Sequence, residues 1–168
     1  LVATVVGSGI MAASLTSDLG LALLANTLAT GAILVVLIPV FGPISGAQFN
    51  PAVTFVLLLR RQLSVGESVL HVLVQMAGGL IGTWVAHLMF AHNLLETSSH
   101  VRTGAPQWFA ECVATFGLVL VILGAKPDPD RTGWLVGLYI VAAYWFTAST
   151  SFANPAVTIA RTFTDTFA

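Results

Sequence analysis

Five consecutive residues, Asn-Pro-Ala-Val-Thr, occur twice in this chain, at residues 50–54 and 154–158. Each copy opens a short apolar stretch, at about 51–59 and 155–163. Asparagine is a favoured helix N-cap, and proline is favoured at the first helical position because its missing N–H costs nothing there. The pattern therefore predicts two short helices that begin in the same way, as parts of an internal repeat.

The rest of the chain consists mainly of long apolar runs. Hydrophobic residues make up 57% of the 168 residues and charged residues only 8%, whereas a soluble domain is about 25% charged. Four runs are long enough to cross a bilayer, at about 20–40, 68–90, 107–125 and 133–148, and a shorter one covers 1–13. The stretches that follow the repeated motif are too short to cross, which predicts re-entrant half-helices in an all-α membrane protein.

The order of these segments predicts one domain over residues 1–168, with repeats at about 1–92 and 106–168. Three spans per repeat is an odd number, so the second repeat enters the membrane with inverted polarity. Short loops rich in basic residues stay in the cytoplasm, and the basic residues divide unequally. Arg60, Arg61, Lys126 and Arg131 fall on the predicted cytoplasmic side, and Arg102 and Arg161 fall on the outer side.

The two asparagines are the main candidate functional residues. An N-capping asparagine accepts from the backbone with its side-chain oxygen, so its amide N–H groups point away from the helix. Asn50 and Asn154 are expected to face a shared point at the membrane midplane as donors, where the two helix N-termini add about half a positive charge each. A neutral polar solute can accept hydrogen bonds there, whereas a cation or proton meets an unfavourable field.

Two longer sequence matches extend this interpretation. The segments Ser-Gly-Ala-Gln-Phe-Asn-Pro-Ala-Val-Thr at 45–54 and Phe-Ala-Asn-Pro-Ala at 152–156, with Gln75 and Glu111, resemble the aquaporins and aquaglyceroporins of the major intrinsic protein family. The resemblance covers essentially the whole chain. It implies six spans, two half-helices that begin at Asn50-Pro51-Ala52 and Asn154-Pro155-Ala156, one pore per subunit and a homotetramer in the lipid bilayer. By that pattern the start of the first span and the whole sixth span are absent, as in a cropped chain.

The resemblance also implies roles for individual residues. Gln75 and Glu111 are expected to be structural supports, with Glu111 accepting from backbone N–H groups of a re-entrant loop. Most family members carry an arginine directly after the second Asn-Pro-Ala, as part of the selectivity filter, and here that residue is Val157. Counting from the motifs places the other filter residues at Thr30, at Ala142 or Ala143, and at Ser151 or Thr150. All these side chains are small, which predicts a wide filter.

Arg161 has two interpretations. It lies one helical turn beyond Val157, which makes it a candidate residue of the outer vestibule. Alternatively, it is an interfacial side chain paired with Asp165, four residues later.

Together these features predict a passive channel for water and small uncharged solutes. The expected solutes are glycerol, urea and neutral metalloid hydroxides such as arsenous acid, as in bacterial family members with valine in place of the filter arginine. Such a protein belongs in the bacterial inner (plasma) membrane. The alternatives are a strict water channel or, from another class, a secondary transporter. We expect no enzymatic activity, cofactor, metal site or nucleic-acid partner.

Overall fold

Two helices in this protein are much shorter than their neighbours, and they begin at the two Asn-Pro-Ala sequences. The computed structural model describes residues 1–125 and 128–165, and Lys126 of the predicted cytoplasmic side lies outside this part. Within it the chain forms α1 (Val2–Leu15), α2 (Leu19–Ser45), α3 (Pro51–Leu59), α4 (Val65–Met89), α5 (Ala105–Gly124), α6 (Pro129–Phe146) and α7 (Pro155–Arg161). The short helices α3 and α7 have nine and seven residues.

Three of the described helices, α2, α4 and α5, are long and apolar enough to cross a membrane. The helix α1 has 14 residues and falls short of that length. Large apolar side chains are exposed along α4 and α5, among them Val69, Leu73, Phe116 and Leu120. Surfaces of this kind are expected where a protein meets lipid or another apolar surface.

The helix α2 continues to Ser45, beyond the predicted end near residue 40, and it includes Pro39 and Pro43. Proline removes a helical hydrogen bond, but it is tolerated in membrane helices when neighbouring helices pack around it. Here the neighbour is α6, because a Cβ atom built on Gly133 would lie only 2.9 Å from the Pro39 ring. The absence of a side chain at Gly133 thus makes room for the proline.

Glycines bring α2 and α6 into close contact along a longer seam. A Cβ atom on Gly137 would lie 2.8 Å from the Gly31 carbonyl oxygen, and one on Gly31 would lie 2.3 Å from the Val141 side chain. Small residues allow such close approach of membrane helices. The seam places Thr30 of α2 beside Tyr144 of α6, with 3.3 Å between their hydroxyl oxygens.

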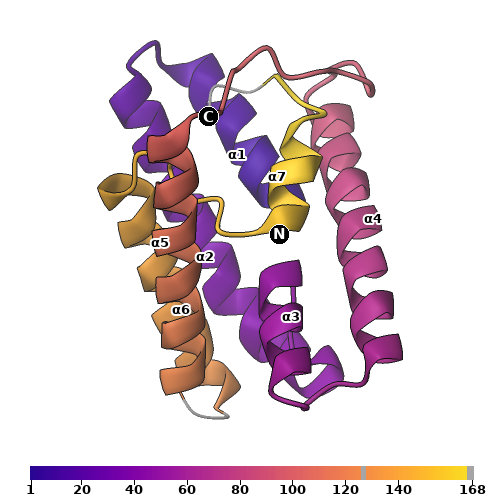
Figure 1. Ribbon diagram of the computed structural model, residues 1–168. Coiled ribbons are helices and arrows are strands. Elements are labelled where there is room, and N and C mark those ends of the chain that lie inside the picture. The colour runs from indigo at the N-terminus through magenta and orange to yellow at the C-terminus, as the bar shows by residue number, and fades with distance from the viewer. Residues whose placement is uncertain (126–127, 166–168) are drawn as a thin grey trace.

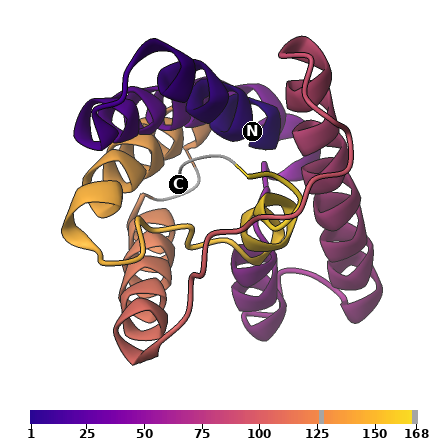
Figure 2. The same ribbon diagram turned by 90° about the horizontal axis from the view of Figure 1, so that it is seen from above.

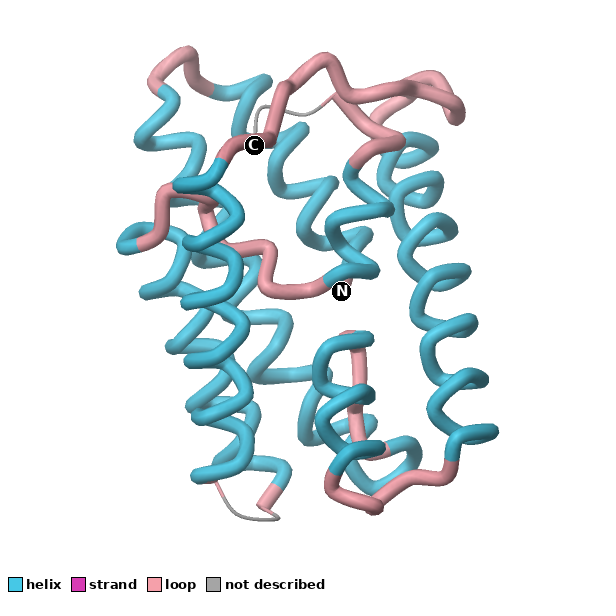
Figure 3. Tube along the Cα trace, viewed as in Figure 1, coloured by secondary structure: helices cyan, strands magenta, loops and turns pink. Residues whose placement is uncertain are grey.

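The two short helices occupy opposite halves of the molecule. Figures 1 and 3 show α3 in the lower half and α7 in the upper half, each starting near mid-height and running away from the other. The ends of α3 and α4 that carry Arg60 and Arg61 lie at the bottom of this view. At the opposite end the segment 90–104 crosses over the molecule from α4 to α5, as seen from above in Figure 2. We call this the outer end, following the charge pattern of the sequence.

Candidate functional site: a cavity at the meeting point of two short helices

Asn50 and Asn154 lie at the centre of the site, each as the N-cap of its short helix. The Asn50 side-chain oxygen accepts from the Ala52 N–H at 2.9 Å, and the Asn154 oxygen accepts from the N–H groups of Ala156 and Val157 at 3.0 and 3.4 Å. Both asparagines are buried, at 6% and 7% exposure. The capping geometry is the one that favours asparagine before a proline.

The amide nitrogens of the two asparagines make a reciprocal pair of bonds between the two loops. Asn50 Nδ2 donates to the Ala153 carbonyl at 2.7 Å, and Asn154 Nδ2 donates to the Phe49 carbonyl at 2.8 Å. An amide NH₂ group has two hydrogens. These two bonds were not expected from the sequence, which predicted only that the amide groups of Asn50 and Asn154 face a shared point as donors. One amide N–H of each asparagine bonds to the opposite loop, and the second N–H is left as a donor.

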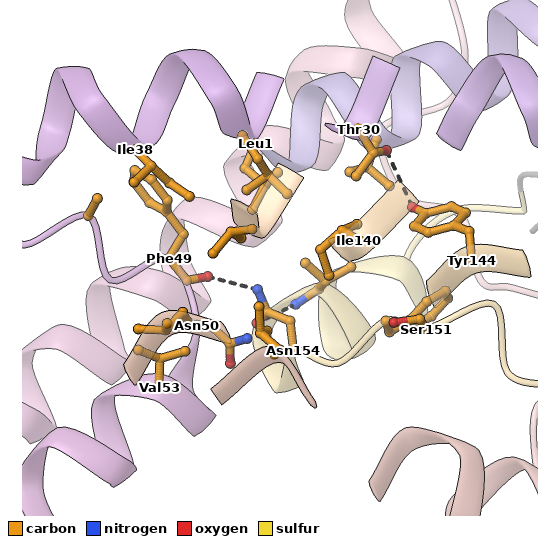
Figure 4. Close-up of a pocket in the computed structure, with 18 residues that line it drawn as sticks. Leu1, Thr30, Ile38, Phe49, Asn50, Val53, Ile140, Tyr144, Ser151 and Asn154 are labelled. Atoms are coloured by element: carbon orange, nitrogen blue, oxygen red, sulfur yellow. Dashed lines mark hydrogen bonds between the residues drawn. The ribbon is translucent and has the colours of Figure 1, made fainter. Parts of the chain in front are cut away.

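These residues border a cavity of about 80 Å³. Its wall is mostly apolar, with Leu34, Ile38, Val136 and Ile140 among the lining residues from α2 and α6. The valines that follow the two motifs, Val53 and Val157, both line it. In Figure 4 the polar groups gather in two places, at Asn50 and Asn154 and at Thr30, Tyr144 and Ser151, with Ile140 between them.

Three of the four residues predicted for the filter lie on this cavity, namely Thr30, Ser151 and Val157. Ala142 does not, because it lies on the exposed face of α6. Ala143 is fully buried and does not line the cavity either. The residue of α6 that reaches the wall near Thr30 is Tyr144. This end of the cavity therefore carries a phenol ring, and its side chains are not all small as the sequence predicted.

Counting back from the second motif caused this error, since the loop before α7 has no fixed length. A better signal was the helical period of α6 itself. Gly133, Val136, Gly137, Ile140 and Tyr144 follow one another at intervals of three or four residues, and all are buried. Residues at that spacing share one helix face. Gly133 and Gly137 thus mark the face of α6 on which Tyr144 lies.

Gln75 and Glu111 each hold one of the two loops. Gln75 Nε2 donates to the Gln48 carbonyl and, at 2.9 Å, to the Thr54 hydroxyl. The Glu111 carboxylate accepts from the Phe152 N–H at 2.9 Å and from the Ala153 N–H at 2.7 Å. The loop before α3 is thus fixed through a carbonyl oxygen, and the loop before α7 through two amide groups. This is the arrangement that the resemblance implies for Glu111.

The loop before α7 has an unusual backbone. Thr150, Ser151 and Ala153 have φ angles of 55°, 49° and 45°, in the left-handed region. Residues other than glycine adopt this conformation rarely and at a cost, so surrounding contacts must impose it. Glu111 supplies two such contacts, and Arg102 supplies others by donating to the Ser149 carbonyl and, at 3.3 Å, to the Thr150 hydroxyl. The sequence analysis did not assign this role to Arg102.

Arg161 does not lie at an exposed membrane interface. Its exposure is 5%, and its guanidinium carbon is 4.8 Å from the centre of the Phe152 ring. The Asp165 carboxylate instead accepts from the backbone N–H of Ser99 at 2.7 Å and from its hydroxyl at 2.9 Å. The burial of Arg161 does not fit the interpretation as an exposed interfacial side chain. Arg161 faces a second hollow, at the outer end, lined also by Arg102, Glu111 and Phe152.

Comparison with known proteins identifies the family. The family model for the major intrinsic proteins matches residues 1–150. The aquaglyceroporin AqpS of Rhizobium meliloti (strain 1021) is 60% identical over 168 residues, covering 99% of this chain and 72% of that protein. The aquaporin TIP1-2 of Musa acuminata is 33% identical over 168 residues, covering 90% of this chain and 65% of that protein.

A more distant relative is the glycerol uptake facilitator protein-like 6 of Lactiplantibacillus plantarum, which is 29% identical over 123 residues, covering 70% of this chain and 57% of that protein. The chain thus spans 57 to 72% of the length of these three relatives. It belongs to the major intrinsic protein family, an integral membrane family of channels and not of enzymes.

Proposed function

We propose that this protein is a passive channel for water and small uncharged solutes, including glycerol, urea and neutral metalloid hydroxides such as arsenous acid. The observation that carries the proposal is the pair of reciprocal bonds between Asn50 and Ala153 and between Asn154 and Phe49, on the wall of one cavity. These bonds fix two amide donors at the centre of a path between the ends of the molecule. The Asn-Pro-Ala residues, 50–52 and 154–156, form its midplane barrier.

The lining supports selectivity for neutral amphipathic solutes. The described lining residues include no aspartate, glutamate, histidine, lysine or arginine side chain. A permeating molecule instead meets fixed donors at the asparagines and hydroxyl groups at Thr30 and Tyr144, separated by apolar wall. A short polyol can hydrogen-bond to the polar groups and place its carbon atoms against the apolar side. An ion loses its hydration shell without replacement, because no charged ligands line the path.

We place the selectivity filter at Thr30, Tyr144, Ser151 and Val157. Valine at 157 leaves this constriction without the usual arginine, which favours solutes larger than water and corresponds to the bacterial type of aquaglyceroporin. The Rhizobium relative is named an aquaglyceroporin, which supports the same solute class. In this proposal α1–α4 and α5–α7 belong to two inverted repeats, the subunits form a homotetramer, and the protein resides in a bacterial plasma membrane.

The test compares permeabilities in proteoliposomes by light scattering after an osmotic step. The unaltered protein should raise water, glycerol and arsenous acid permeability above that of empty vesicles. Val157→Arg should lower glycerol permeability about tenfold or more while leaving most water flux, because pore width and lining charge set selectivity. Val157→Leu is the matched control, since it adds bulk without charge. Unchanged glycerol flux in Val157→Arg would contradict the proposal that valine at position 157 leaves the filter wide.

Tyr144 favours one alternative, a strict water channel. Its ring lies on the cavity wall beside Thr30, at the end of the cavity for which the sequence predicted only small side chains and a wide filter. A strict water channel would raise water permeability and leave glycerol flux at the level of empty vesicles. A secondary transporter would instead show saturable uptake driven by an ion gradient, and the lining described above offers no ionisable side chain of the usual kind for coupling.

A further inference from the structure

The outer end of this cavity lacks an arginine on its wall, but it does not lack positive charge. Arg102 comes from the segment 90–104, which passes over the outer end beside the loop 147–154 (Figure 2). Its guanidinium carbon lies 3.9 Å from the centre of the Phe152 ring. Phe152 borders both the central cavity and the outer hollow that contains Arg102. One aromatic residue thus separates the path from this cation.

We propose that Arg102 is a selectivity-determining residue, which supplies from the α4–α5 segment the cation-repelling charge that Val157 does not provide. The inference rests on the proposed channel function. Arg161 adds a second guanidinium within 4.8 Å of the same ring. The charge acts through the wall of the cavity, where a low local dielectric weakens its field less than water would.

The position of Arg102 is fixed by contacts with two residues of the loop before α7 that do not themselves line the cavity. Its Nη2 donates to the Ser149 carbonyl and to the Thr150 hydroxyl, which precede the lining residues Ser151 and Phe152. A guanidinium bound in this way to neutral groups keeps its full charge. Burial lowers the pKa of the Arg102 side chain while Glu111 and Tyr144 act to raise it. Arginine nevertheless remains protonated throughout the physiological range.

No carboxylate of the described residues lies within 4.0 Å of the Arg102 guanidinium. Glu111 shares the outer hollow, but both its oxygens accept backbone N–H groups, at 2.9 and 2.7 Å. The Glu111 carboxylate is therefore bound to the loop backbone and not to the Arg102 guanidinium.

A purely structural role for Arg102 makes a different prediction. If the residue only fastens the loop, any side chain that preserves the loop preserves selectivity, whatever its charge. If the charge matters, a neutral residue of similar length opens the path to cations even when solute flux is normal. Lysine keeps the charge without the forked hydrogen bonds of arginine. Arg102→Met and Arg102→Lys therefore separate the two roles.

The experiment measures cation leak and glycerol flux in the same vesicles containing the intact protein. Arg102→Met should raise sodium and proton leak about tenfold, which corresponds to about 1.4 kcal/mol of barrier, and Arg102→Lys should stay near the unaltered protein. Arg60→Met, at the opposite end, is the matched control and should not leak. Equal leak in Arg102→Lys and Arg102→Met, or none in a conducting Arg102→Met, would overturn the proposal. Absence of water and glycerol flux in the unaltered protein would instead refute the channel function itself.

A second measurement changes the charge after folding. Arg102 is half-buried, and a cysteine placed there in a Cys112→Ser background can react with methanethiosulfonate reagents. A reagent that adds a quaternary ammonium group should reduce the cation leak of Arg102→Cys, and one that adds a sulfonate should increase it. Equal leak after both reagents would overturn the role of charge even if Arg102→Met fails to fold.

Discussion

The loops that lead into α3 and α7 end in the same five residues but are built differently. The loop before α3 contains one non-glycine residue in the left-handed region, Ala47, next to Gly46, and a neutral amide from Gln75 holds it. The loop before α7 contains three such residues and no glycine, and a carboxylate and a guanidinium hold it. Two identical motifs are thus preceded by loops that are held in different ways, the first by the neutral side chain of Gln75 and the second by the charged side chains of Glu111 and Arg102. The comparison teaches that the repeat duplicates the asparagine donors but not the electrostatics around them.

The largest expected effects on stability come from replacing the side chains that hold the two loops, Glu111 and Gln75. In Glu111→Gln, an NH₂ group that can only donate replaces one of the two oxygens that each accept one backbone N–H, so the N–H of Phe152 or Ala153 loses its acceptor in a strained loop. Its cost should be about 3 kcal/mol of stability, because bonds to charged groups are worth about twice neutral ones. Gln75→Leu should cost about 1 kcal/mol. Thermal unfolding in detergent measures both, and equal losses would contradict the asymmetry.

The asparagines should behave symmetrically, in contrast to their supports. Asn50→Ala and Asn154→Ala each leave one buried carbonyl, of Ala153 or of Phe49, without its donor. Each change should cost about 2 kcal/mol. The double variant should cost less than the sum, since both bonds maintain the same contact. Unfolding of the single and double variants in the same detergent tests this, and strict additivity would show that the two bonds are independent.

Tyr144 offers a smaller and more specific test of the outer end. Tyr144→Ala removes the ring beside Thr30 and should raise glycerol permeability severalfold relative to water, because the constriction widens. Tyr144→Phe removes only the hydroxyl that lies 3.3 Å from the Thr30 hydroxyl and is the matched control. The two permeabilities are compared by light scattering. A glycerol-to-water ratio that does not change in Tyr144→Ala would place the narrowest point elsewhere.

The smallest expected effects concern the backbone of the two loops. Ala47 and Ala153 have φ angles of 49° and 45°, which glycine adopts without penalty. Ala47→Gly should stabilise the protein by about 0.5 kcal/mol, since the relief of strain slightly exceeds the added entropy of the unfolded chain. Ala153→Gly should be close to neutral, because Ala153 is fully buried and its methyl group packs in the core. A clear loss in Ala47→Gly would show that its backbone is not strained.

Sequence alone predicted where the helices lie, because apolar runs are easy to locate, but α2 continues to Ser45 and α6 is not among the described helices that are long and apolar enough to cross a membrane. The N-caps at Asn50 and Asn154 followed from local chemistry, and Gln75 and Glu111 from the family pattern. What sequence could not supply were contacts across the chain. The reciprocal asparagine bonds join residues 103 and 105 positions apart, and Arg102 reaches a loop 47 residues away. Tyr144 was missed for a simpler reason, since loop length was used where helical period was the better guide.

The reciprocal bonds also limit when the two loops can pair during synthesis of the chain. At a synthesis rate of about 5 to 20 residues per second, Ala153, which lies 103 positions after Asn50, is added about 5 to 20 s later. During that delay the Phe49 carbonyl and the Asn50 amide have no partner in the second half. An unpaired polar group is costly in lipid. The two loops can therefore form their final contact only after the second half has been synthesised.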